Sequence, residues 1–120
     1  MLKRLDGYAK LTLDFNDRLT HPFGYLHGGA IASLADSAGI NAVLSLIGDN
    51  EKALTLEMKI NYFKPAGNIT IYAEGRAIYK GKQFAVSDVD VKNVTRQLIA
   101  KTIVTCSISS NNSGPVSLNP

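Results

Sequence analysis

The chain reads His27-Gly28-Gly29-Ala30-Ile31-Ala32-Ser33-Leu34-Ala35-Asp36, and this stretch carries its strongest structural signal. Two glycines open an apolar run, and one carboxylate lies inside that run with no neighbouring cation. A buried acid without a partner costs free energy, so Asp36 indicates chemistry rather than packing. Glycines at a helix start leave bare backbone amides, which can hold a developing negative charge. The stretch therefore predicts a helix with functional groups at its start and at Asp36.

The helix is expected to run from Gly28 to about Ile47, where Gly48-Asp49-Asn50 ends it. These 20 or so residues would make about 30 Å of helix. The segment is apolar nearly all round, so we expect it to be buried on most sides. Small polar residues recur at every fourth position and would let a sheet approach closely: Ser33, Ser37, Asn41 and Ser45. That explanation does not account for Asp36.

Five segments around this helix have the alternating pattern of strands: 8–15, 54–62, 69–79, 84–92 and 97–108. In 84–92 the inward side switches between Val86 and Val89, which predicts a bulge there. Hairpin-length turns join the last four strands, so they are expected to pair antiparallel. The predicted fold class is α+β, with an antiparallel sheet curled around one long central helix. Such a sheet leaves edges and one face open, which favours dimerisation.

Length and composition predict one domain over residues 1–108, followed by a disordered tail over 109–120. The net charge is +3, and no run of lysine or arginine marks a nucleic-acid surface. Cys106 is the only cysteine, so it cannot form an intrachain disulfide, and in a strand it is expected to be a packed thiol. No segment is long enough to span a membrane and the N-terminus has no apolar signal core, which predicts a soluble cytoplasmic protein.

Three segments together resemble the hotdog-fold acyl-CoA thioesterases: His21-Pro22-Phe23-Gly24-Tyr25-Leu26-His27-Gly28-Gly29, Leu34-Ala35-Asp36-Ser37-Ala38, and Asn61-Tyr62-Phe63-Lys64-Pro65-Ala66. The branch they resemble comprises the phenylacetic-acid-degradation thioesterases, acyl-CoA thioesterase 13 and the dihydroxynaphthoyl-CoA thioesterases. The resemblance runs from about Asp14 to Ile108. It implies an enzyme that hydrolyses an acyl-CoA thioester to the free acid and coenzyme A.

The resemblance also implies roles for individual residues. Asp36 attacks the thioester carbonyl or activates a water, and the Gly28 amide holds the thioester oxygen. His27 orients its loop and assists the leaving thiolate, and the Thr55 hydroxyl positions the acid or the water. His21 stands where the family usually has an asparagine or glutamine, so this chain departs from the pattern there.

Coenzyme A is part of the substrate in this family, and no metal or further cofactor is implied. The expected phosphate contacts come from a turn at Gly81, flanked by Lys80 and Lys82, which suit phosphates. Lys64 and Arg76 are weaker candidates of the same kind, and the pattern favours solvated strand charges for both.

Spacing along the helix adds an independent inference about assembly. Gly28 and Asp36 are eight residues apart, which separates them by about 12 Å on one helix. Both cannot touch one carbonyl, so if both act, Gly28 of one subunit must face Asp36 of another. The resemblance agrees, since it implies a homodimer or a dimer-of-dimers tetramer with sites at the subunit interface.

Two other functions fit parts of the pattern. His21 in His21-Pro22-Phe23-Gly24 is faintly similar to the histidine of hotdog dehydratases and hydratases acting on β-hydroxyacyl thioesters, but their Gly-Asp-x-Asn-Pro signature is absent. A non-catalytic acyl-CoA-binding protein would keep the pocket without needing the acid.

Overall fold

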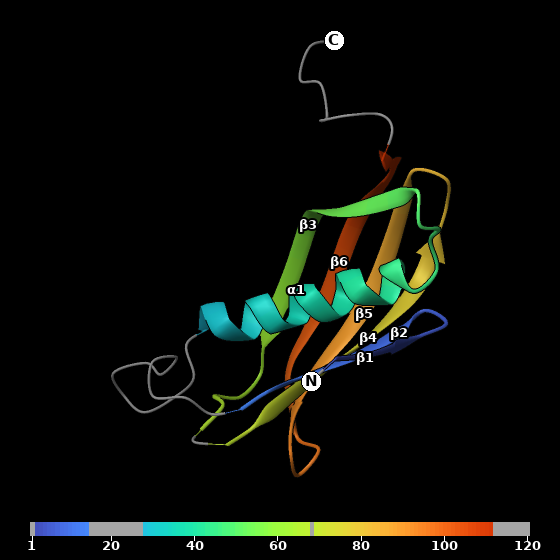
Figure 1. The fold of residues 1–120 in the computed structure, drawn as a ribbon. Helices are drawn as coiled ribbons and strands as arrows, with labels where there is room; N and C mark the ends of the chain where they lie inside the picture. The colour runs from blue at the N-terminus through green and yellow to red at the C-terminus, as the bar shows by residue number, and fades with distance from the viewer. Residues whose placement is uncertain (1, 15–27, 68, 112–120) are drawn as a thin grey trace.

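The computed structural model describes residues 2–14, 28–67 and 69–111. A helix, α1 (Gly28–Leu44), lies across one face of a six-stranded antiparallel sheet with the order β1-β2-β4-β5-β6-β3 (Figure 1). The strands are β1 (Leu2–Leu5), β2 (Tyr8–Leu13), β3 (Glu51–Tyr62), β4 (Ile71–Lys80), β5 (Phe84–Asn93) and β6 (Leu98–Ser110). The predicted α+β hotdog architecture is confirmed. We call the face under α1 the inner face and the opposite one the outer face.

The strand β1 was not predicted from the sequence. It pairs with β2 through a two-residue turn, in which Asp6 and Gly7 have φ values of 51° and 84°. An Asp-Gly pair with positive φ at both residues is the turn that matches strand twist in a hairpin. Two side chains at the end of the helix hold this hairpin: Asn41 of α1 accepts from Arg4 at 2.9 Å, and the hydroxyl of Ser45, just after α1, accepts from the Gly7 amide at 2.7 Å. Two residues of the polar stripe therefore dock the hairpin.

The helix begins at Gly28 as predicted but ends at Leu44, not near Ile47. The chain tightens there, because the Leu46 amide bonds the Val43 carbonyl three residues back. In the described chain the helix is buried along one side only, and Gly29 and Ser33 are exposed. The expectation of burial on most sides is wrong for a single chain.

Within the described ranges, no helix is long and apolar enough to cross a membrane.

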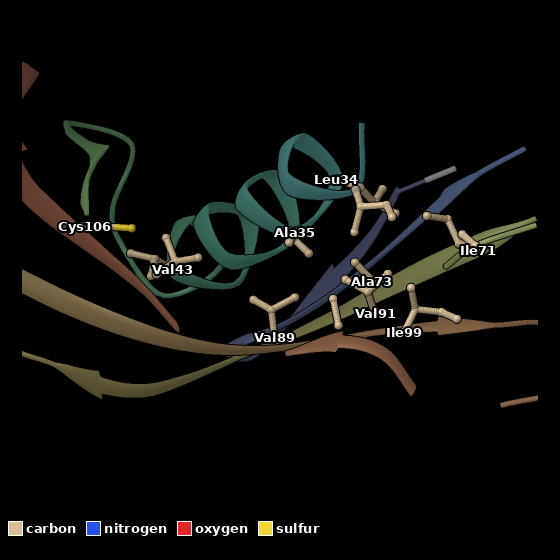
Figure 2. Packing of buried hydrophobic residues seen from close by; sticks show 14 of the residues in the cluster. Leu34, Ala35, Val43, Ile71, Ala73, Val89, Val91, Ile99 and Cys106 are labelled. Atoms are coloured by element: carbon tan, nitrogen blue, oxygen red, sulfur yellow. The ribbon is translucent and has the colours of Figure 1, made fainter. Parts of the chain in front are cut away.

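The core lies between α1 and the inner face of the sheet (Figure 2). Leu34, Ala35 and Val43 descend from the helix, and Val89 and Val91 rise from β5 (Figure 2). Every second residue of β5 is buried, from Ala85 to Asn93, so the same side of the strand faces inward along its whole length. The bulge predicted in β5 is wrong.

The irregularity in this part of the sheet lies on the neighbouring strand instead. Ala77 of β4 is opposite Ser87, and Tyr79 is opposite Val86, so the extra residue is Ile78. The bounds of two strands also differ from those predicted. The strand predicted over 8–15 is β2, which ends at Leu13, and β6 continues to Ser110, past the predicted domain limit at residue 108. The predicted tail from 112 onward lies outside the described residues.

Two glycines bring the helix unusually close to the sheet. A Cβ added to Gly75 of β4 would lie 2.5 Å from the Ala38 carbonyl oxygen, and one added to Gly39 would lie 2.8 Å from Val104 Cγ2. The Ser87 hydroxyl donates to the Gly39 carbonyl at 2.8 Å across this contact. The contact fixes the position of α1 over the sheet, and with it the position of Asp36.

Candidate active site

Asp36 and Thr55 meet between the helix and the edge strand β3. Asp36 is half-buried on α1, and the Thr55 hydroxyl donates a hydrogen bond of 2.6 Å to its Oδ1. Among the described residues, this is the one hydrogen bond that the Asp36 carboxylate receives. A short bond from a hydroxyl offsets part of the cost of desolvating a carboxylate and fixes its orientation. The acid is therefore held in place with a carboxylate oxygen left for chemistry.

A buried thiol lies behind this pair. Cys106 is opposite Thr55 in the β3–β6 register and is fully buried. Burial, and then the negative charge of Asp36, raise the pKa of the Cys106 thiol to about 11, against a smaller lowering by Thr55. The thiol stays protonated at neutral pH, so it is a packed group, as predicted, and not a nucleophile. Its position next to Asp36 had no signal in the sequence.

The helix start is tied to the same strand. The Tyr62 hydroxyl, near the end of β3, donates to the Gly28 carbonyl oxygen at 2.9 Å. A Cβ at Gly28 would lie 3.5 Å from that hydroxyl, an ordinary contact distance. Tyr62 therefore ties the first residue of α1 to the end of β3, at the helix terminus where anions bind most readily.

The helix is continuous from Gly28 past Asp36, so about 12 Å of axis separates them within one chain. The Gly28 and Asp36 groups therefore cannot reach the same carbonyl in one chain, as the spacing predicted.

The residues predicted to contact phosphate lie in two separate places within one chain. Lys80, Gly81 and Lys82 are in the β4–β5 hairpin, where the Gly81 amide bonds the Phe84 carbonyl. Lys64 follows β3 and bonds Ile99 through its backbone amide, near the other end of β6. About eight residues of β6, or roughly 26 Å, separate these positions. Lys64 therefore cannot share a phosphate with Lys80 or Lys82 of its own chain.

Two predicted site residues, His21 and His27, lie outside the described residues. Arg76 is described, and it lies on the outer face, away from Asp36.

The hydroxyl of Thr55 gives a testable prediction about positioning. Thr55→Val keeps the side-chain shape but leaves the half-buried carboxylate without its described donor. We expect kcat for thioester hydrolysis to fall about 10- to 100-fold, the range expected when a hydrogen bond to a charged group is lost. Thr55→Ser, which restores the hydroxyl, should recover most of the rate, and Thr105→Val on the outer face is the matched control. Full activity in Thr55→Val would contradict the positioning role.

A long helix on a curled antiparallel sheet, with an acid of the helix held by a strand hydroxyl, defines a single-helix hotdog protein. A family model described as the thioesterase superfamily matches residues 23–100, and the chain belongs to this superfamily. The resemblance to thioesterases of this kind is thereby confirmed.

Individual proteins show the same likeness. A relative from Saccharolobus solfataricus is 39% identical over 100 residues, which are 82% of this chain and 65% of that protein. The chain thus spans slightly less than two thirds of that relative's length. The 1,4-dihydroxy-2-naphthoyl-CoA hydrolase of Listeria monocytogenes is 33% identical over 105 residues, covering 86% of this chain and 82% of the hydrolase. A Streptococcus mutans structure bound to acetyl CoA has a TM-score of 0.82 at 28% identity, covering 90% and 86% of the two chains.

Proposed function

We propose that this protein hydrolyses acyl-CoA thioesters to the free acid and coenzyme A at the Asp36–Thr55 site. The observation that carries the proposal is the 2.6 Å hydrogen bond that holds a half-buried carboxylate on the inner face. Membership of the thioesterase superfamily and the likeness to a naphthoyl-CoA hydrolase support the same reaction. The likeness to a structure bound to acetyl CoA supports a coenzyme A thioester as the substrate.

The carboxylate can act in two ways. As a nucleophile, an Asp36 oxygen adds to the thioester carbon, the C–S bond breaks, and water hydrolyses the resulting anhydride. As a general base, Asp36 takes a proton from water while the water oxygen adds to that carbon. In both routes a tetrahedral oxyanion forms, and the thiolate of coenzyme A leaves and is protonated. An amide at Gly28 aimed at this oxyanion would contribute about 3 kcal/mol.

The site is proposed to need two subunits, because Gly28 and Asp36 of one helix are too far apart for one carbonyl. Mixing Asp36→Ala and His21→Ala subunits should restore part of the activity that each lacks alone. Mass spectrometry would verify the mixed dimer, and CoA release would measure the rescue. A verified mixed dimer without rescue would contradict the shared site.

Coenzyme A phosphates are proposed to lie near the β4–β5 hairpin. Lys80 is in line across the sheet with Ala85, Cys106 and Thr55. Three strand spacings put the hairpin about 14 Å from Thr55, at the same end of the sheet. The pantetheine arm of coenzyme A separates thioester from phosphates, so this placement suits one substrate molecule. Cytoplasmic localisation and the absence of a metal stay predictions.

A panel of aromatic and aliphatic acyl-CoAs tests the function directly. The wild-type protein should release CoA from at least one member, as detected with a thiol reagent. Crotonyl-CoA, followed by loss of its double-bond absorbance, tests the hydratase alternative in parallel. Hydration without CoA release would favour the hydratase, and tight binding without turnover would favour a non-catalytic binder. Either result would overturn the proposed hydrolysis.

A further inference from the structure

A charged groove opens on the outer face of the sheet, opposite the site described above. It has a volume of about 630 Å³ and is formed by β2, β4, β5 and the turn that follows β5. A smaller hollow of about 330 Å³ continues it past Lys10 and Thr12 towards Lys3. Both volumes lie in the range of small-molecule sites. We call the larger hollow the outer groove.

The walls of the outer groove carry more positive than negative charge. Lys10, Arg76, Lys92 and Arg96 line it, with Glu74 as the one carboxylate among its lining residues. Glu74 is already engaged, because it accepts a 2.7 Å hydrogen bond from the Tyr8 hydroxyl and lies 3.7 Å from Lys92 Nζ. In the part of the chain that the structure describes, Lys10, Arg76 and Arg96 make no ion pair with a carboxylate. The lining thus has an excess of three positive charges.

Aromatic rings hold two of these cations in place. Lys10 Nζ lies 4.4 Å from the centre of the Tyr72 ring, and the Arg76 guanidinium lies 5.0 Å from the Tyr8 ring. Burial, and then the hydrogen bond to Glu74, raise the pKa of Tyr8 to about 12. Tyr8 therefore stays neutral and adds no negative charge. Cations positioned before binding lose less side-chain entropy when an anion arrives.

We propose that the outer groove binds a small ligand that carries a chain of two or more phosphate groups. Such a ligand matches several cations converging on one hollow, and arginine can contact phosphate through two parallel N–H donors. The Thr12 hydroxyl lines the same hollow and can donate to a phosphate oxygen, whereas the Thr70 hydroxyl already donates to Asp14 at 3.1 Å.

The neighbouring surface favours a compact anion over an extended one. Asp88 and Asp90 occupy β5 beside the groove, and both bind Lys101 of β6 at 2.9 Å and 2.7 Å. Acids at this position interrupt the positive surface, so a nucleic-acid backbone laid across the sheet would meet negative charge. Asp88 and Asp90 lie directly opposite Arg76 and Glu74, and their pairing with Lys101 offsets part of the negative charge that a short oligophosphate would meet.

The outer groove is separate from the proposed hydrolytic site. Thr55 lies on β3 at one edge of the sheet and on its inner face, whereas the groove lies over β2, β4 and β5. Phosphate binding in the outer groove is therefore independent of the proposed hydrolase activity.

Isothermal titration calorimetry of the full chain with inorganic tripolyphosphate tests the proposal, with ATP and a single-stranded oligonucleotide as further arms. We expect saturable binding of tripolyphosphate with one site per chain. Arg76→Gln and Arg96→Gln should each weaken it about tenfold, since each removes a charged contact. Lys59→Gln removes one charge from the outer face of distant β3 and should leave the affinity unchanged. Circular dichroism checks that each variant folds, and exposed Arg96 is the safer substitution.

Each outcome bears on the proposal. Equal binding of tripolyphosphate and ATP would identify the phosphate chain as the determinant, and tighter ATP binding would add a nucleoside contact. Both support the site. No saturable binding, or equal weakening by Lys59→Gln, would overturn it. Tighter binding of the oligonucleotide than of tripolyphosphate or ATP would also overturn it, in favour of nucleic acid.

Discussion

Asp36→Asn is expected to lower kcat for CoA release by about 10²- to 10⁴-fold, the range for loss of a general base. The amide has the size of the carboxylate, and its oxygen can still accept the Thr55 hydrogen bond seen at 2.6 Å. It can neither take a proton nor attack a carbonyl at a useful rate. Steady-state CoA release on the best substrate of the panel measures the effect.

The matched control is Asp49→Asn, which makes the same chemical change at an exposed position outside the helix and should leave kcat unchanged. Calorimetry with a thioether analogue checks that Asp36→Asn still binds. Retained turnover in folded Asp36→Asn would remove Asp36 from the mechanism, whether as nucleophile or as base.

Gly75→Ala is expected to give the largest loss of stability among the single substitutions considered. Its Cβ would lie 2.5 Å from the Ala38 oxygen and 2.8 Å from the Ala38 carbonyl carbon, both backbone atoms of α1. Backbone cannot rotate away as a side chain can, so helix and sheet must separate. We expect the free energy of unfolding to fall by about 3 kcal/mol, the upper end for overpacked cores.

Urea denaturation measures this loss as a lower midpoint with an unchanged slope. Gly67→Ala is the control, since a Cβ there meets nothing within 4 Å and should change the stability little. Equal midpoints for the two variants would show that the close contact of α1 with β4 does not constrain the fold.

Much of the architecture could be predicted because it follows local pattern. Apolar alternation marks β3 in the sequence, although a register shift between Thr55 and Glu57 changes which side of the strand faces inward. The two glycines mark the start of α1. Its end was placed too late because the apolar pattern continues past Leu44, while backbone bonding does not. The hairpin β1–β2 carried a usable signal in Asp6-Gly7 that apolar alternation alone does not detect.

The β5 error has a physical reason in the packing. Small Ala85 and Ser87 face inward, while apolar Val86 is on the other face. Hydrophobicity alone therefore misidentified which side of the strand is buried.

The candidate site was predictable in part. Asp36 was indicated by its place in an apolar run and Thr55 by the family resemblance, and the contact between the two is present in the fold. Cys106 and Tyr62 reach the site through strand register and long side chains, which spacing along the chain does not encode. The outer groove could not be predicted either, because spacing along the chain does not show which residues of different strands lie together. The four cations that line it come from β2, β4, β5 and the turn after β5, so they lie together only when the sheet has formed.

The structure of the protein with a non-hydrolysable thioether analogue of an acyl-CoA would locate the reacting atoms. We expect the analogue's sulfur and the adjoining carbon next to the Asp36 carboxylate and the Thr55 hydroxyl, on the inner face. We also expect a Gly28 amide from a second subunit on the opposite side of that carbon. An analogue whose reacting atoms lie away from Asp36, or wholly against the outer groove, would contradict this placement.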